Sequence, residues 1–102
     1  MILDNYVLKG LDNMDALNEK GILIKLNNQT IREAVELWLE NENEAIKLYG
    51  HISEWDTSEV TNMKELIKYA KYFNEDIGSW DVSNVKDMSA MFSEAYLFNQ
   101  SL

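Results

Sequence analysis

His51 is the only histidine in this chain of 102 residues, and imidazole is the side chain best suited to acid–base chemistry near neutral pH. A lone histidine cannot form a metal cluster, and no serine or cysteine nucleophile is arranged around it. The chain also has no cysteine, which excludes disulfide bonds and thiolate metal sites. We therefore expect a structural role for His51, no catalytic residue, no cofactor and no metal.

Acidic residues are the second candidates for chemistry. Eighteen Asp and Glu residues against nine Lys and Arg give a net charge of −9, which argues against nucleic acid as a partner. So many carboxylates form chance pairs, and no general acid–base pair can be singled out. Asp56 and Asp81 recur at a fixed spacing that invites calcium, but calcium-binding repeats are rich in glycine and this chain has four glycines. Hydrogen bonding at chain corners is the favoured role of both aspartates.

Trp55 and Trp80 share that spacing, and two roles are open for them. They could form an aromatic strip on a binding face, or a buried packing ladder, which the strict period favours. The positions around them would be exposed on a strand face, where repeat proteins bind their partners. The candidate partner-binding residues are Glu54, Thr57, Glu59, Ser79, Val82 and Asn84.

All these residues belong to an internal repeat of 25 residues. The segment that starts at Ile52 reads ISEWDTSEVTNM, and the segment that starts at Ile77 reads IGSWDVSNVKDM. Two units, residues 52–76 and 77–101, are followed by Leu102 at the place where a third would begin. In each unit an alternating segment predicts a short strand, Ser and Asn predict a corner, and apolar residues at helical spacing predict a short helix. Such units must stack to bury their apolar edges.

The segment before the repeat has a helical pattern. Thr30 to Glu33 resembles a capping box, and the apolar stripe that follows is interrupted at residues 40–44 before it resumes as far as Gly50. We expect two consecutive helices, or one kinked helix, that cap the first repeat. Upstream, residues 12–20 could form a short helix and residues 22–26 a strand.

The predicted fold is therefore an α/β protein: a short solenoid of two strand–corner–helix units, similar to leucine-rich repeats, with an N-terminal helical cap. Residues 1–51 would form the N-terminal segment and cap, residues 52–102 the repeats, and both would fold as one unit. The last repeat would leave an uncapped end, and its candidate contact residues are Met91, Phe98 and Leu102.

The repeat resembles a known family. The pattern Ile-x-x-Trp-Asp-x-Ser-x-Val-x-x-Met, followed by Met-Phe and Ala in residues 91–95, is similar to BspA-like leucine-rich-repeat surface proteins of the mycoplasma lipoprotein type. The resemblance covers roughly residues 27–102. It implies a solenoid with an adhesion or protein-binding role and no enzymatic activity.

Function and location follow as expectations. We expect a non-enzymatic module that binds a protein through the repeat face or the open end; the alternative is an assembly subunit, of a virion or cell surface, that self-associates through the open end. No apolar run is long enough to span a membrane. The first residues lack the features of a signal peptide, which leaves an intracellular or virion location, or the cell surface if the chain is a fragment.

Overall fold

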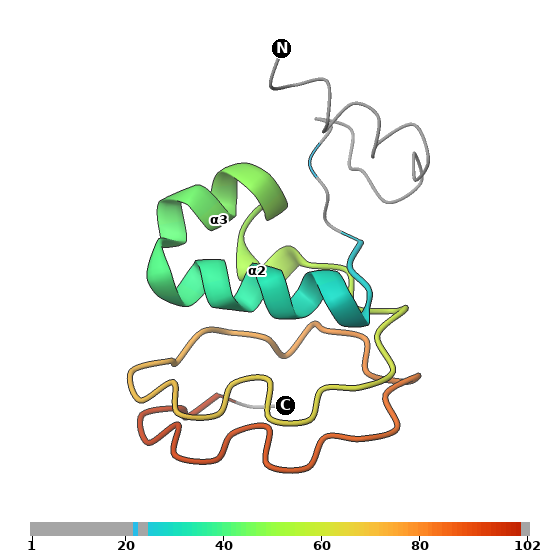
Figure 1. The fold of residues 1–102 in the computed structure, drawn as a ribbon, viewed down its shortest axis with the longest axis vertical. Coiled ribbons are helices and arrows are strands. Elements are labelled where there is room, and N and C mark those ends of the chain that lie inside the picture. Colours follow the sequence, from blue (N-terminus) through green and yellow to red (C-terminus); the bar gives the residue numbers. More distant parts are fainter. Residues whose placement is uncertain (1–21, 23–24, 101–102) are drawn as a thin grey trace.

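Two helices lie over two stacked coils of chain in the computed structural model, which describes residues 22 and 25–100. Helix α2 spans Asn28–Glu40, helix α3 spans Glu42–Tyr49, and a 3-10 turn, η2, covers Ile52–Glu54. Figure 1 shows the first coil, residues 52–76, between α2 and the second coil, residues 77–100. The helix expected at residues 12–20 and most of the strand expected at 22–26 lie outside the described residues.

The two helices occur where the sequence indicated, but the first begins earlier. Asn27, not Thr30, is the N-cap: its side-chain oxygen accepts hydrogen bonds of 2.9 Å from the backbone N–H groups of Gln29 and Thr30. Thr30 returns the bond by accepting from the Asn27 N–H at 2.8 Å. The capping box is thus Asn27–Thr30. Gly50, with φ of 77°, ends α3 in the left-handed region that glycine favours.

The predicted α/β solenoid is wrong. Within the described residues the repeats contain neither a strand nor an α-helix, and parallel pairing is limited to the isolated bridges Lys25–Asp56 and Asn62–Asp87. The segments expected to be helical are chains of tight turns, in which a backbone N–H bonds to the carbonyl three residues earlier. Tight turns of this kind recur about every three residues, so they place apolar side chains much as a helix would. Apolar spacing alone could not distinguish the two.

Left-handed residues stop each turn segment from becoming a helix. Glu65 and Tyr69 have φ of 59° and 67°, and Ala90 and Glu94 have φ of 56° and 60° at the equivalent positions of the second coil. A side chain bearing a Cβ costs about 1 kcal/mol or more in this region, so the conformation needs support from its surroundings. Its occurrence at matching positions shows that both coils follow the same backbone path here.

Side-chain acceptors make the corners of each coil. Asp56 accepts a 2.9 Å bond from the N–H of Ser58, and Asp81 accepts a 2.9 Å bond from the N–H of Ser83. The corner role predicted for Asp56 and Asp81 is therefore confirmed. The structure shows no group of three or more His, Cys, Asp or Glu that could hold a metal ion in the described part of the chain.

His51 makes the same kind of corner. Its Nδ1 accepts a 3.2 Å bond from the N–H of Ser53, while Asp76, the equivalent residue of the next coil, accepts a 3.0 Å bond from the N–H of Gly78. The His51 ring also packs edge-on against Trp38, with the ring centroids 5.1 Å apart. The geometry agrees with the structural role expected from the sequence.

The two coils are joined by a ladder of backbone hydrogen bonds. Alternate N–H groups of the first coil, which we term the upper N–H row, donate to carbonyl groups of the second coil. The bonds are Met63 to Asp87 at 2.8 Å, Glu65 to Ser89 at 3.0 Å, Ile67 to Met91 at 2.9 Å and Tyr69 to Ser93 at 2.8 Å. This ladder joins the segments that the sequence predicted to be short helices.

The core runs through the helices and both coils. Trp55 and Trp80 are buried, and their rings stack with centroids 6.1 Å apart and planes inclined by 16°. Their Nε1 groups donate to the carbonyls of Gly50 and Ile52, at 2.9 and 2.8 Å, so neither indole leaves a polar group unpaired. The packing-ladder role is confirmed, and the binding-strip role is wrong.

Candidate functional site

The six candidate partner-binding residues do not form one surface. Thr57 is fully buried, and its hydroxyl donates a 2.9 Å bond to the carbonyl of Asp81 in the second coil. Thr57 therefore cannot reach a partner, and its inclusion is corrected. The reason is local: Thr57 lies two residues after Trp55 and is buried with it, whereas Asp56 between them is half-buried, so position 57 faces the second coil.

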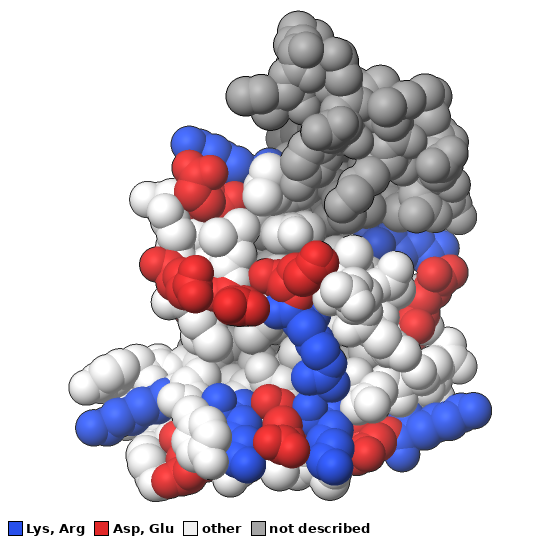
Figure 2. Space-filling model, viewed as in Figure 1, with Lys and Arg blue, Asp and Glu red and all other residues white. Residues whose placement is uncertain are grey.

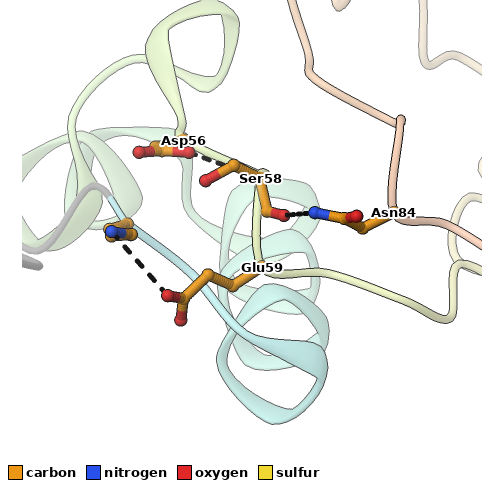
Figure 3. A network of polar contacts seen from close by, with 5 residues as sticks. Asp56, Ser58, Glu59 and Asn84 are labelled. Atoms are coloured by element: carbon orange, nitrogen blue, oxygen red, sulfur yellow. Dashed lines mark hydrogen bonds and ion pairs between the residues drawn. The ribbon is translucent and has the colours of Figure 1, made fainter.

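Ser79 and Asn84 are exposed, but they link the two coils. Ser79 donates from its hydroxyl to the carbonyl of Ser53 at 2.7 Å, and Asn84 donates from its amide to the carbonyl of Ser58 at 2.7 Å. Figure 3 shows Asn84 reaching across to Ser58, beside the Asp56 corner. The same figure shows Glu59, which forms a 3.7 Å ion pair with Lys25. The contacts of Ser79 and Asn84 join the two coils, and that of Glu59 holds Lys25 against the first coil, so all three side chains have structural contacts.

The remaining candidates differ in accessibility. Glu54 is exposed, and Val82 is 40% exposed. Met91 is only 3% exposed, so it is a core residue rather than an open contact. Phe98 is half-buried and stacks on Phe92, with ring centroids 4.4 Å apart. Leu102 lies outside the described residues.

A surface that the sequence reasoning missed carries large exposed apolar side chains beside the turn segments. Tyr72 is 77% exposed, and the other members are between 49% and 68% exposed. We term this surface the tyrosine face; it consists of Leu39, Tyr69, Tyr72, Tyr96 and Leu97. Monomeric proteins rarely leave such side chains clustered in water unless they meet a partner.

Backbone and charge contacts fix the tyrosine face. The N–H of Leu97 donates to the carbonyl of Lys71 at 3.2 Å, which places the Tyr96–Leu97 pair directly against the Lys71–Tyr72 pair. The amine of Lys71 lies 5.5 Å from the centre of the Tyr72 ring, and the amine of Lys68 lies 5.0 Å from that of Tyr69. These cation–π contacts restrict the rings before any partner binds.

A groove runs across the tyrosine face, between the helices and the first coil. It has a volume of about 430 Å³, and its walls include Leu39 of α2 together with Tyr69 and Tyr72 of the first coil. Two carboxylates, of Glu42 and Glu75, and one basic side chain, of Lys71, also line it, so its charged groups carry a net negative charge. The groove therefore combines apolar walls with negative charge, which suits an apolar side chain that is flanked by basic groups.

Two titratable groups near the tyrosine face have shifted pKa values. The Tyr96 hydroxyl donates to the Glu94 carboxylate at 3.0 Å, which raises the pKa of Tyr96. A hydrogen bond from Lys68 to Glu65, at 3.1 Å, and the charge of that carboxylate raise the pKa of Lys68. Both groups thus keep their protons at neutral pH, so Tyr96 presents a hydroxyl and Lys68 an ammonium group.

The charge pattern differs between helices and coils. On the face shown in Figure 2, acidic side chains form a band over the helices, whereas the coils below carry both basic and acidic side chains. A basic partner would be attracted to this molecule over a distance set by the ionic strength.

Residues 11–102 match the family described as Mycoplasma protein of unknown function, DUF285. The chain belongs to the DUF285 family. No curated protein and no solved structure matches it significantly. The match supports the coarser part of the resemblance, membership of the mycoplasma repeat family, and it carries no leucine-rich-repeat or BspA-like assignment.

One signal for the tyrosine face was present in the sequence of this DUF285 member. Tyr69 and Tyr72 fall outside the apolar stripe of the expected helix, which runs through residues such as Ile67 and Ala70. Large aromatic residues off the buried stripe predict an exposed patch. The structure adds that Leu97, which is equivalent to Tyr72, completes the patch on the second coil. No helix in the described part of the chain is long and apolar enough to cross a membrane.

Proposed function

We propose that the chain is a non-enzymatic protein-interaction module whose contact surface is the tyrosine face. The observation that carries the proposal is the grouping of five large exposed apolar side chains beside a groove. Tyrosine is enriched among the residues that dominate binding energy, because it combines a large apolar ring with a hydroxyl and few rotatable bonds. The resemblance to BspA-like surface repeats points to the same kind of role.

The partner that suits this surface carries an apolar side chain flanked by Lys or Arg. The apolar side chain would enter the groove between Leu39 and Tyr72, and the basic groups would meet Glu42 and Glu75. Binding of this kind weakens as salt is added, because the carboxylates are exposed or half-buried and their attraction is screened.

Site-specific cross-linking tests the surface. A photo-reactive amino acid at position 72 should capture a partner from a lysate of the source organism, whereas the same amino acid at Ser83, an exposed corner elsewhere on the second coil, should not. The captured protein, once purified, should bind the unmodified chain, and Tyr72→Ala should weaken that binding by about tenfold or more.

Tyr72→Phe is the matched control, because it keeps the ring and loses only the hydroxyl. Because Tyr72 is 77% exposed, neither substitution should change the unfolding midpoint appreciably. Equal capture from positions 72 and 83, or unchanged affinity of Tyr72→Ala for the purified partner, would refute the tyrosine face as the contact surface.

A further inference from the structure

The chain itself carries the kind of group that its groove suits. The groove combines apolar walls with a net negative charge, and such a site suits an apolar side chain flanked by a basic group. On the coil side of the groove, the amine of Lys71 lies 5.5 Å from the centre of the Tyr72 ring. This Lys–Tyr pair is an apolar ring held beside a positive charge, and Tyr72 is 77% exposed.

Two charges on opposite sides of the groove are unpaired within the described part of the chain. Glu42, at the start of α3, and Lys71, on the first coil, are both exposed, and neither forms an ion pair or a side-chain hydrogen bond there. By contrast, Lys68 pairs with Glu65 at 3.1 Å. The groove therefore presents an unpaired carboxylate on its helix side and an unpaired amine on its coil side.

The same division of charge extends along both sides of the groove. Residues 36–44, in the helices, include four Glu and no Lys or Arg, whereas residues 64–72, in the first coil, include three Lys and one Glu. Figure 2 shows acidic side chains over the helices and basic side chains among those of the coils. A surface with one negative and one positive side is complementary to itself when a second copy is turned by half a turn about an axis along the groove.

Such a two-fold arrangement places the helix side of each copy against the coil side of the other. Each Tyr72 ring would meet Leu39 and the groove of the other copy, and each Lys71 would meet Glu42. Every contact occurs twice, as in any two-fold dimer. Tyr72 and Leu39, which are 77% and 49% exposed, would leave water together.

We propose that the tyrosine face binds the tyrosine face of a second copy of this chain, in a two-fold dimer that pairs Glu42 of each copy with Lys71 of the other. This inference rests on the proposed function, because it names the partner of the same surface. A second copy is favoured over an unrelated protein because the chain supplies both the acidic groove and the ring with its flanking amine.

The overall charge opposes this dimer only at long range. Each copy carries a net charge of −9, so two copies repel each other at a distance. At about 0.15 M salt, exposed charges more than about 8 Å apart are largely screened, whereas charges in direct contact are screened much less. The Glu42–Lys71 contacts therefore still act at this salt concentration.

Sedimentation of the 102-residue chain at about 0.15 M salt tests the dimer. The chain should change from monomer to dimer between about 10 µM and about 1 mM. Tyr72→Ala should raise the dissociation constant of the dimer by about tenfold or more. Tyr72→Phe keeps the ring and should pair as the unsubstituted chain does.

An exchange of charges locates the contact. Glu42→Lys and Lys71→Glu should each weaken self-pairing by about tenfold or more, because every dimer of one variant sets like charges together twice. An equimolar mixture of the two variants should pair as the unsubstituted chain does, since both contacts then join Lys to Glu. Glu33→Lys, at an exposed position of α2 that does not line the groove, makes the same charge change as Glu42→Lys and should leave pairing intact.

The mixture also separates the contact from an effect on folding. Glu42 lies in the first turn of α3, where a carboxylate stabilises the helix, so Glu42→Lys could weaken α3 itself. A weakened helix would not be repaired by mixing with Lys71→Glu. Restored pairing in the mixture therefore identifies a contact between copies.

The results that overturn the dimer differ from those that overturn the proposed function. A chain that remains monomeric at about 1 mM, while cross-linking at position 72 captures a different protein, would overturn the dimer and retain the proposed function. A monomeric chain with equal capture from positions 72 and 83 would overturn both. Self-pairing that persists in both charge variants, or a mixture that stays monomeric, would overturn the two-fold contact.

Discussion

The two coils have nearly the same sequence pattern and backbone path, yet their equivalent side chains lie in different environments. Met63 is fully buried and Met88 is 41% exposed; Thr57 is fully buried and Val82 is 40% exposed. The first coil lies between α2 and the second coil, whereas the second coil is covered on one side by the described residues. Burial in this molecule is therefore set by what lies next to a coil as well as by the residue types within it.

That difference has a consequence for mutational effects. The same substitution should change the free energy of unfolding by different amounts in the two coils, because the same residue type fills a core position in one coil and a surface position in the other. Substitutions at paired positions measure the contribution of the neighbouring layer directly.

The methionine pair should give the largest contrast. Met63→Ala removes a fully buried side chain and leaves a cavity, so it should lower the free energy of unfolding by about 2–5 kcal/mol. Met88→Ala, at the equivalent exposed position, should cost at most about 1 kcal/mol. Urea unfolding of both variants measures the contrast, and equal costs would show that the second coil is covered in solution.

The pair Thr57 and Val82 tests the polar link between the coils. Thr57→Val keeps the volume but leaves the carbonyl of Asp81 without the Thr57 hydroxyl, which should cost about 0.5–1.5 kcal/mol. Val82→Thr introduces a hydroxyl that water can reach and should change stability by less than about 0.5 kcal/mol. Thermal unfolding distinguishes the two variants. A larger loss of stability for Val82→Thr than for Thr57→Val would contradict the exposure of Val82.

The left-handed residues should behave alike in both coils, because their backbone geometry is the same. Glu65→Gly, made in a Lys68→Ala background so that no Glu65–Lys68 ion pair is lost, and Ala90→Gly each relieve a Cβ at positive φ, against a gain of entropy in the unfolded chain. We expect each to raise stability by at most about 1 kcal/mol. Denaturant unfolding that found opposite signs at the two positions would show that the coils differ in more than their covering.

The corner pair Asn62 and Asp87 should give the smallest effect, visible only in acid. Bonds from the Ser89 hydroxyl and N–H lower the pKa of Asp87, while Asn62 makes the same corner without a charge. A lowered folded-state pKa gives stability that is present above the unfolded-state pKa and is lost as pH falls below about 4. Asp87→Asn should flatten this part of the stability profile, and an unchanged slope between about pH 4 and pH 2 would contradict it.

The sequence predicted the features that depend on local chemistry. The helices before Gly50, the corners at Asp56 and Asp81, and the stacking of Trp55 on Trp80 follow from capping, side-chain acceptors and a strict period. Sequence patterns of this kind reflect interactions between residues close in the chain or related by the repeat.

The missed features depend on backbone conformation and on distant neighbours. Tight turns and a helix give similar apolar spacing, and nothing in the residue types of Glu65 or Tyr69 signals a positive φ. The strand prediction failed because corners at Asp56 and Asn62 are too close together for a strand to form between them. Thr57 was assigned to the surface, but the second coil covers it and accepts its hydroxyl bond at the carbonyl of Asp81, which is a contact between distant residues.

Hydrogen exchange in the free 102-residue chain tests the contrast between the coils most directly. We predict that the backbone N–H groups of the upper N–H row exchange at least about tenfold more slowly than the equivalent N–H groups of the second coil, because only the upper row is bonded to a neighbouring coil. The groups compared in the second coil are those of Met88, Ala90, Phe92 and Glu94. Equal protection of the two sets of N–H groups in dilute solution would contradict this difference between the coils, since the N–H groups of the second coil would then be shielded from solvent as well.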